Sequence, residues 1–172
     1  IERCIQSAID QTYRNFEVIV VDNGSTDNSL EKIKTFLCNP RVVIIELKKN
    51  IPPGVGKESA FGVAIQRSSG RYVSVLYADD WYLPTKIEKQ VSLFSKSSNS
   101  VGVIYCHGYR YLEQSGRMSK WKHQSVRGYV FRSYLLNGDV VIPISPLVKR
   151  HCYDIVGLNN IWTGSEYDFL VM

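Results

Sequence analysis

Acidic side chains follow two of the short apolar runs in this sequence, where they could bind a cation or a nucleotide. Asp22 closes the run Phe16–Val21. Asp79 and Asp80 follow the run Tyr72–Leu76. A carboxylate at the end of a strand can accept hydrogen bonds from a ribose or a base, and adjacent carboxylates suit a Mg²⁺ ion that also binds phosphate oxygens. For either acid alone, the simpler explanation is that it caps the helix that follows.

Two further segments carry weaker signals. Gly54–Gly56 stands in a Pro-rich loop where the backbone could approach a phosphate, and Lys57 after it could contact that phosphate. A flexible loop and a solvated lysine are the alternatives. Glu166 lies between Trp162 and Phe169, and apolar neighbours can tune the proton affinity of a carboxylate for base catalysis. Taken alone, a glutamate near aromatic residues is more often a residue on a helix surface.

The periodicity of apolar residues predicts the scaffold that must position these side chains. Helical spacing is expected over Ile1–Ile9, Leu30–Leu37, Phe61–Gly70, Ile87–Phe94, Tyr129–Leu136 and His151–Val156, and strands at Phe16–Val21, Val42–Leu47, Tyr72–Leu76, Val101–Tyr105 and Ile144–Val148. Tyr109–Leu112 and Met118–Trp121 are expected to form an antiparallel hairpin. Because strands alternate with helices, we expect an α/β fold with a mostly parallel sheet, flanking helices and a mixed or antiparallel C-terminal part.

Length and composition indicate one folded domain. The chain has 172 residues, of which 44% are hydrophobic and 22% charged. Its formal charge of +5 favours anionic partners, but the basic residues form no run of the kind that binds nucleic acid. No apolar run approaches the roughly 20 residues of a membrane span. The sequence lacks an initiator Met and a signal peptide, and we expect it to be a fragment trimmed at both ends.

The cysteines show no spacing typical of a metal site or of a disulfide scaffold. The four residues are Cys4, Cys38, Cys106 and Cys152. We expect them to be buried free thiols in a reducing compartment.

Taken in order, these motifs resemble those of the inverting nucleotide-sugar glycosyltransferases of family 2, which have the GT-A fold. The stretches that carry the resemblance are Gln11–Tyr13, Phe16–Asp27, Gly70–Val73, Ala78–Lys86, Ser145–Arg150, Gly157–Leu158 and Ser165–Phe169. The resemblance covers almost the whole chain. It implies a single GT-A-like domain over residues 1–172 that lacks the family's first strand and its C-terminal segment.

The resemblance also implies roles for individual residues. Asp22, with help from Asn23 and Ser25, would contact the base or ribose of the nucleotide. Asp79 would coordinate Mg²⁺ or Mn²⁺ bridging the two phosphates of the donor. Glu166 matches the base that deprotonates the acceptor hydroxyl.

The implied reaction is metal-dependent, inverting transfer of a hexose-type sugar from a nucleotide-diphosphate donor, which we expect to be UDP-linked, to an acceptor hydroxyl. The expected setting is bacterial envelope or capsular polysaccharide synthesis, with a glycan or lipid-linked acceptor, in the cytoplasm at the inner face of the membrane, with peripheral membrane association. Tyr77 stands where the family usually has an acid. The alternatives are therefore an inactive nucleotide- or sugar-binding module of the same fold, or a sugar nucleotidyltransferase.

Overall fold

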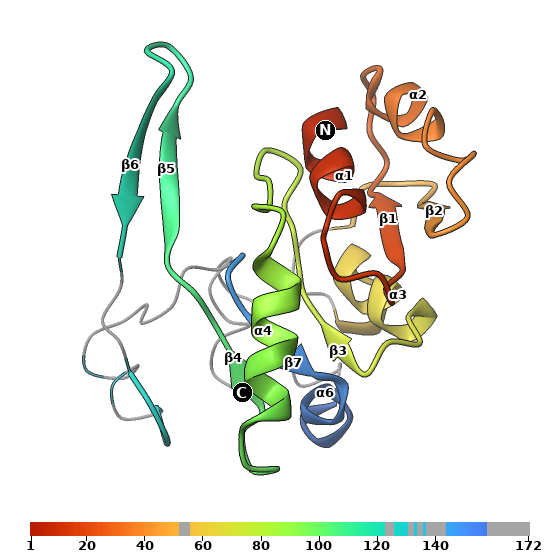
Figure 1. The fold of residues 1–172 in the computed structure, drawn as a ribbon. Coiled ribbons are helices and arrows are strands. Elements are labelled where there is room, and N and C mark those ends of the chain that lie inside the picture. The colour runs from red at the N-terminus through yellow and green to blue at the C-terminus, as the bar shows by residue number, and fades with distance from the viewer. Residues whose placement is uncertain (52–55, 123–125, 131–132, 134–135, 137–143, 158–172) are drawn as a thin grey trace.

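The computed structural model describes residues 1–51, 56–122, 126–130, 133, 136 and 144–157 (Figure 1). Its elements in chain order are α1 (Glu2–Ile9), β1 (Val18–Asp22), α2 (Ser29–Lys34), β2 (Val42–Glu46), the 3₁₀ helix η1 (Gly56–Glu58), α3 (Ala60–Arg67), β3 (Tyr72–Val73), α4 (Lys86–Ser95), β4 (Val103–Ile104), β5 (Gly108–Leu112), β6 (Arg117–Trp121), β7 (Leu147–Lys149) and α6 (Arg150–Val156). This order confirms the predicted α/β fold. Half of the predicted helix at Tyr129–Leu136 lies outside the described residues.

The first strand pair is parallel, as the alternation of strands and helices predicts. β1 and β2 pair in register from Val18 opposite Val42 to Asp22 opposite Glu46. Both strands are rich in Val and Ile, whose branched side chains pack well on a pleated surface. Since β1 and β2 run in the same direction, α2 makes the crossover between them.

The second strand group has an order that local patterns do not show. β7, near the C-terminal end of the described chain, lies between β3 and β4 and is antiparallel to both. β3 and β4 are therefore parallel to each other in direction, but they are not neighbours. The expected strand at Tyr72–Leu76 is shorter than predicted, because only Tyr72–Val73 pairs with β7. The mixed C-terminal part of the prediction is confirmed.

A small core joins α3, β7 and α6. Ile65, Val148 and Tyr153 are buried together, and the ring of Phe61 meets that of Tyr153 edge-on at 5.6 Å between centroids. The guanidinium of Arg150 donates to the Ile65 carbonyl at 2.9 Å, at the C-terminal end of α3. The same carbonyl also accepts from the Ser68 hydroxyl at 2.8 Å. A cation at the C-terminal end of a helix complements the helix dipole.

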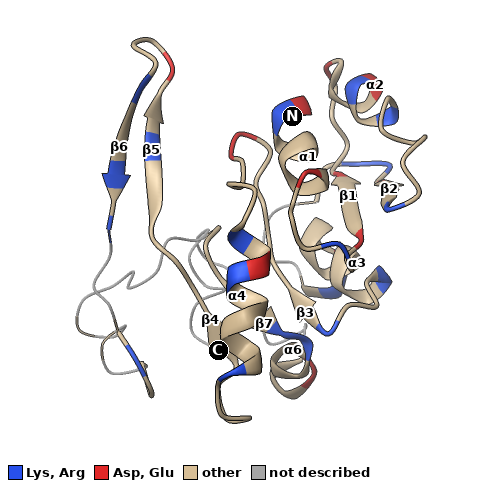
Figure 2. Cartoon of the chain, in the orientation of Figure 1, with Lys and Arg blue, Asp and Glu red and all other residues tan. Residues whose placement is uncertain are grey.

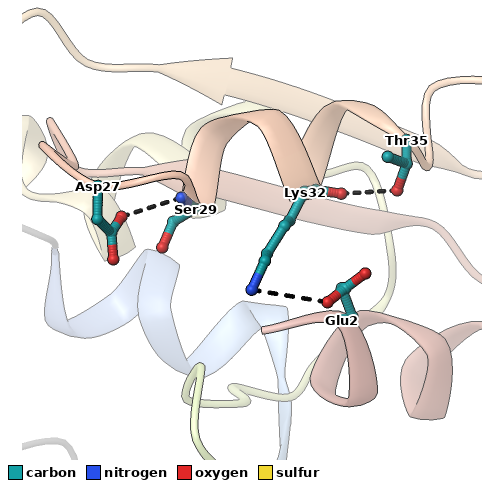
Figure 3. Close-up of polar contacts among 5 residues, drawn as sticks. All are labelled: Glu2, Asp27, Ser29, Lys32 and Thr35. Atoms are coloured by element: carbon teal, nitrogen blue, oxygen red, sulfur yellow. Dashed lines mark hydrogen bonds and ion pairs between the residues drawn. The ribbon is translucent and has the colours of Figure 1, made fainter.

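Local polar contacts fix the start and the end of α2 (Figure 3). The carboxylate of Asp27 accepts a hydrogen bond from the Ser29 backbone N–H at 3.0 Å. The Ser29 hydroxyl and this N–H together lower the pKa of Asp27. The hydroxyl of Thr35 donates to the Lys32 carbonyl at 2.7 Å. Lys32 also pairs with Glu2 of α1 at 3.8 Å, but both side chains are exposed, and such a pair stabilises the fold little.

All four cysteines are free thiols, but their burial differs from the prediction. Cys4 is buried and Cys38 is exposed, because Cys38 follows α2 in a surface turn. None of the described helices combines the length and the apolar character that a membrane crossing demands.

A glutamate links the entry of β1 to the segment between α3 and β3. Glu17 Oε1 accepts hydrogen bonds from the Ser69 backbone N–H at 2.6 Å, the Ser69 hydroxyl at 2.8 Å and the Gly70 N–H at 3.2 Å. Burial by itself would raise the pKa of Glu17, but these bonds outweigh it and lower the pKa from its usual 4.5. The bonds therefore favour the charged carboxylate in the folded state.

We predict that Glu17→Gln destabilises the protein in a pH-dependent way. A lowered folded-state pKa contributes stability that is present above the unfolded pKa and is lost as the pH falls through the folded pKa. Urea titrations should show a loss of about 1 kcal/mol at pH 7, because the site is partly exposed, and a smaller difference below about pH 4. Glu113→Gln, in the exposed turn between β5 and β6, is the matched control. An equal loss at both pH values for Glu17→Gln would contradict the prediction.

Candidate active site

Asp22 is the last residue of β1, and its side chain is buried with an exposed fraction of 4%. Oδ2 accepts a hydrogen bond from the Ser25 backbone N–H at 3.2 Å. This bond closes a turn and does not cap a helix, since α2 begins only at Ser29. The other oxygen, Oδ1, has no hydrogen-bond partner among the described residues. A buried acceptor without a donor costs about 1–3 kcal/mol, so Oδ1 suits a ligand that brings an N–H or O–H group.

The two residues after Asp22 hold a neighbouring loop in place. The Asn23 amide donates to the Ile51 carbonyl at 2.8 Å, and its oxygen accepts from the Ile51 N–H at 3.0 Å. Gly24 has a φ of +72°, and a Cβ there would lie 2.6 Å from the backbone nitrogen of Asn50. Only glycine fits this approach. The amide of Asn23 thus has a structural task that the sequence pattern does not show.

Ser25 and Lys57, the other predicted nucleotide contacts, are both exposed. Ser25 stands beside Asp22 through the backbone bond described above. Lys57 lies in η1, where its carbonyl accepts a hydrogen bond from the Gln66 amide at 2.8 Å. The nucleotide-binding roles of both side chains stay predictions, and so does that of Asn23.

The second acidic group forms a tight turn beyond β3. The Asp80 backbone N–H donates to the Tyr77 carbonyl at 3.1 Å, and the Cys4 thiol of α1 donates to the same carbonyl at 3.2 Å. Asp79 is exposed, whereas Asp80 is partly buried. Burial and the negative charge of Asp79 raise the pKa of Asp80. The turn therefore concentrates negative charge at one place.

Asp22 and the acidic turn lie at the same end of the molecule, on either side of α1 (Figure 1). Figure 2 shows the acidic turn as the red loop to the left of α1. α1 contacts both sides, since it packs against β1 and its Cys4 thiol binds the turn. α1 therefore links the two acidic groups that the sequence singles out.

The carboxylates of the turn suit a hard divalent cation. Among the residues that the structure describes, no three His, Cys, Asp or Glu side chains gather as a metal site. Asp79 and Asp80 nevertheless offer adjacent carboxylate oxygens, and Asp79 is accessible. Mg²⁺ commonly takes one or two carboxylates and completes its shell with water and phosphate oxygens. The donor set thus fits a cation that is shared with a diphosphate.

An aromatic residue directly after the acidic turn is held by two partners. The Arg3 guanidinium stacks on the Trp81 ring at 3.4 Å from its centroid. The Tyr111 ring of β5 meets the same indole edge-on, with centroids 5.3 Å apart. Sequence reasoning missed this group, because its three members come from α1, the turn and the hairpin.

The buried amide of Gln11 binds the chain that leaves the acidic turn. Its exposed fraction is 2%. Nε2 donates to the carbonyls of Ser7 and Leu83, each at 3.0 Å, and Oε1 accepts from the Ile87 N–H at 3.1 Å. Next to it, the Thr12 N–H donates to the Pro84 carbonyl at 2.9 Å. These bonds fix α1 to the first turn of α4 and so position the acidic turn between them.

A second polar group lies beneath the turn. The buried Tyr82 hydroxyl shares a hydrogen bond with the Ser74 hydroxyl at 2.8 Å and also binds the Val75 carbonyl. Lys86 Nζ donates to the Ser74 hydroxyl at 3.0 Å and lies 4.1 Å from the Tyr82 ring centroid. Burial lowers the pKa of Lys86 to about 8 and raises that of Tyr82. The network links the start of the turn to α4.

Glu166, the predicted catalytic base, lies outside the described residues together with Trp162 and Phe169. The Gly54 part of the Pro-rich loop is outside them as well. Their roles stay as the sequence predicts them.

Comparison with known proteins agrees with this geometry. The model of glycosyl transferase family 2 matches residues 1–147. An uncharacterised glycosyltransferase of Methanocaldococcus jannaschii is 24% identical over 179 aligned positions, which cover 99% of this chain and 58% of the relative. An uncharacterised glycosyltransferase of Rickettsia conorii is 37% identical over 70% of this chain and 19% of its own length. Chondroitin synthase of Pasteurella multocida is 34% identical over 67% of this chain and 13% of its own length.

Solved structures share the fold. S. aureus TarS 1–349 in complex with UDP superposes with a TM-score of 0.68 at 18% identity, covering 99% of this chain and 49% of that one. The same protein in complex with UDP-GlcNAc gives a TM-score of 0.66, covering 98% of this chain and 47% of that one. These matches show the GT-A fold, and this chain spans about half of the structures that it matches.

We predict that Gln11→Ala lowers the free energy of unfolding by about 2–3 kcal/mol. The substitution leaves the Ser7 and Leu83 carbonyls and the Ile87 N–H without their partner in a buried place. Gln6→Ala is the matched control, because Gln6 is exposed and its side chain, among the described residues, bonds to Asp10 just beyond α1. The effect of this substitution should stay within about 0.5 kcal/mol. Equal effects of the two substitutions in guanidinium titrations would refute the role of Gln11.

Proposed function

Because this chain belongs to glycosyltransferase family 2, we propose that it transfers a sugar from a UDP-linked donor to an acceptor hydroxyl with inversion at the anomeric carbon. The uridine donor is supported by the complexes of TarS with UDP and with UDP-GlcNAc, which share the fold. The whole protein's acceptor and setting are part of the same proposal: a glycan or lipid-linked acceptor in envelope or capsular polysaccharide synthesis, in the cytoplasm and in peripheral contact with the inner face of the membrane.

The observation that carries the proposal is the buried Oδ1 of Asp22, for which the described part of the chain supplies no hydrogen-bond donor. The base or the ribose of a nucleotide presents N–H and O–H groups that can satisfy this oxygen. The fold already holds this carboxylate at the end of β1 through its bond to the Ser25 N–H, so the ligand group would complete its hydrogen bonding. In open α/β sheets, ligands bind beyond the carboxyl ends of the strands. Asn23, Ser25 and Lys57 complete the proposed donor contacts.

We propose that Asp79, supported by Asp80, holds Mg²⁺ or Mn²⁺ at the diphosphate. Such a cation, when bound, offsets the charge that grows on the nucleoside diphosphate as it leaves. The protein itself positions the acidic turn. The Gln11 side chain bonds to the Leu83 carbonyl and the Ile87 N–H, and the Cys4 thiol bonds to the Tyr77 carbonyl, so the turn is held before any ligand binds. A prepared site avoids the cost of ordering these groups during the reaction.

We propose Glu166 as the catalytic base. Its carboxylate takes the proton of the acceptor hydroxyl while the acceptor oxygen forms a bond to the anomeric carbon. The bond from that carbon to the diphosphate oxygen breaks on the opposite face, and the electron pair leaves with the nucleoside diphosphate. One displacement inverts the centre. Support for this assignment comes from the sequence motif at Ser165–Phe169.

The donor site is tested by titrating the protein with UDP in an isothermal calorimeter, with and without Mn²⁺. We expect binding that Mn²⁺ strengthens at least tenfold. Asp22→Ala should weaken UDP binding at least tenfold in both conditions, because it removes the acceptor of a buried hydrogen bond. Asp79→Ala should abolish only the strengthening by Mn²⁺.

Asp154→Ala provides the matched control for these titrations, because Asp154 is an exposed acid on α6. It should bind UDP as the unmodified protein does. Absence of Mn²⁺-dependent UDP binding by the unmodified protein would overturn the proposed donor site.

Glu166→Gln separates binding from chemistry. The amide keeps the size of the side chain but cannot take a proton, so UDP affinity should stay within twofold. Release of UDP from UDP-GlcNAc in the presence of an acceptor should fall at least 100-fold. A variant that still turns over at the original rate would assign the base to another residue.

A further inference from the structure

The hairpin of β5 and β6 projects on one side of the acidic turn (Figure 1). Its register places Tyr109 opposite Lys120 and Tyr111 opposite Met118. Directly opposed residues of an antiparallel pair share a face, and so do residues two apart along a strand. These four residues therefore form one face, which we call the tyrosine face.

The tyrosine face is continuous with the candidate active site. Tyr111 contacts Trp81 edge-on at 5.3 Å between ring centroids, and Trp81 directly follows Asp79 and Asp80 in the chain. The Arg3 guanidinium of α1 lies against both rings, 3.4 Å from the Trp81 centroid and 5.3 Å from the Tyr111 centroid. A row of aromatic rings thus leads from the acidic turn onto the hairpin.

These side chains are accessible although they are large and apolar. The exposed fractions are 47% for Tyr109, 38% for Tyr111 and 48% for Met118. Exposed apolar side chains that gather in one place, next to a site for another ligand, commonly mark a binding surface. Tyrosine suits a sugar, because its ring packs on the C–H face of a pyranose and its hydroxyl hydrogen-bonds to sugar hydroxyls.

The charge of the hairpin specifies the ligand further. Residues 108–122 include four basic residues, Arg110, Arg117, Lys120 and Lys122, against one acid, Glu113. The resulting charge of +3 is more than half of the chain's +5. Lys120 belongs to the tyrosine face itself, opposite Tyr109, whereas Arg110 and Arg117 lie on the other face of the hairpin and contribute only to its net charge. A ligand that carries negative charge is therefore favoured over a neutral one.

We propose that the tyrosine face binds the acceptor, and that the acceptor is a sugar chain with acidic groups. This inference rests on the proposed glycosyl transfer. Pyranose rings lie on Tyr109 and Tyr111, an acidic substituent pairs with Lys120, and the end of the chain reaches past Trp81 to the donor.

A lipid surface would use the same charges but a different part of the hairpin. The turn of the hairpin, Glu113–Gly116, has the sequence Glu-Gln-Ser-Gly and carries no apolar side chain to insert into a bilayer. Its glutamate would be repelled by anionic headgroups. The observations therefore favour the glycan.

The test uses three probes in separate titrations of the chain: a chondroitin hexasaccharide as an acidic glycan, cellohexaose as a neutral one, and vesicles of phosphatidylglycerol. We expect the acidic hexasaccharide to bind at least tenfold more tightly than cellohexaose. The double variant with Tyr109→Ala and Tyr111→Ala should bind the acidic hexasaccharide at least tenfold more weakly. Lys120→Ala should weaken this binding about threefold, and less at 0.5 M salt, where the charge is screened.

Leu112→Ala is the matched control, because Leu112 is exposed on the opposite face of the hairpin. The affinity of this variant for the hexasaccharide should stay within twofold of that of the unmodified protein. Tyr109→Ala alone keeps the test valid if loss of the contact between Tyr111 and Trp81 disturbs the fold.

Three results would overturn the proposal: no binding of the hexasaccharide, binding that the tyrosine substitutions leave unchanged, or vesicle binding that alone depends on the tyrosines. UDP binding in the presence of Mn²⁺ is measured in parallel and should stay within twofold in every hairpin variant. If the unmodified protein did not bind UDP, that result would count against the proposed donor site. The result with the hexasaccharide would still test the tyrosine face by itself.

Discussion

The hydrogen bonds of one buried amide decide where the acidic turn lies. Gln11 follows α1, and its side chain satisfies a carbonyl of α1, a carbonyl beyond the acidic turn and an N–H at the start of α4. A buried amide is stable only when its partners are all in place, so this contact selects one arrangement of three segments that are distant in sequence. That arrangement fixes the position of the turn that carries Asp79.

The same logic applies below the turn. Ser74, Tyr82 and Lys86 form a polar network where a purely apolar core would tolerate several packings. Lys86 has a pKa of about 8 because burial disfavours its charge, which fits a group that is held by a hydroxyl and an aromatic ring. Rigidity beneath the acids is consistent with a site that must receive a diphosphate without rearranging.

The proposed binding functions lie on two sides of α1, which differ in charge and in aromatic surface. The end of β1 offers a buried carboxylate oxygen that requires a donor, which suits the neutral groups of a nucleotide. The other side offers accessible carboxylates, then Trp81, then the basic hairpin. The proposed donor would thus be held by acids and a cation, and the proposed acceptor by tyrosines and a lysine.

The sequence by itself determined the parallel pair β1 and β2, the helices between strands, the hairpin and the acids at strand ends, because each is recorded in the spacing of neighbouring residues. Family 2 followed from the order of those motifs. Only the tertiary structure decided that β7 separates β3 from β4, that Gln11 is buried, and that Arg3, Trp81 and Tyr111 meet. These contacts join residues dozens of positions apart, and no local periodicity states which distant side chains share a hydrogen bond or a ring contact.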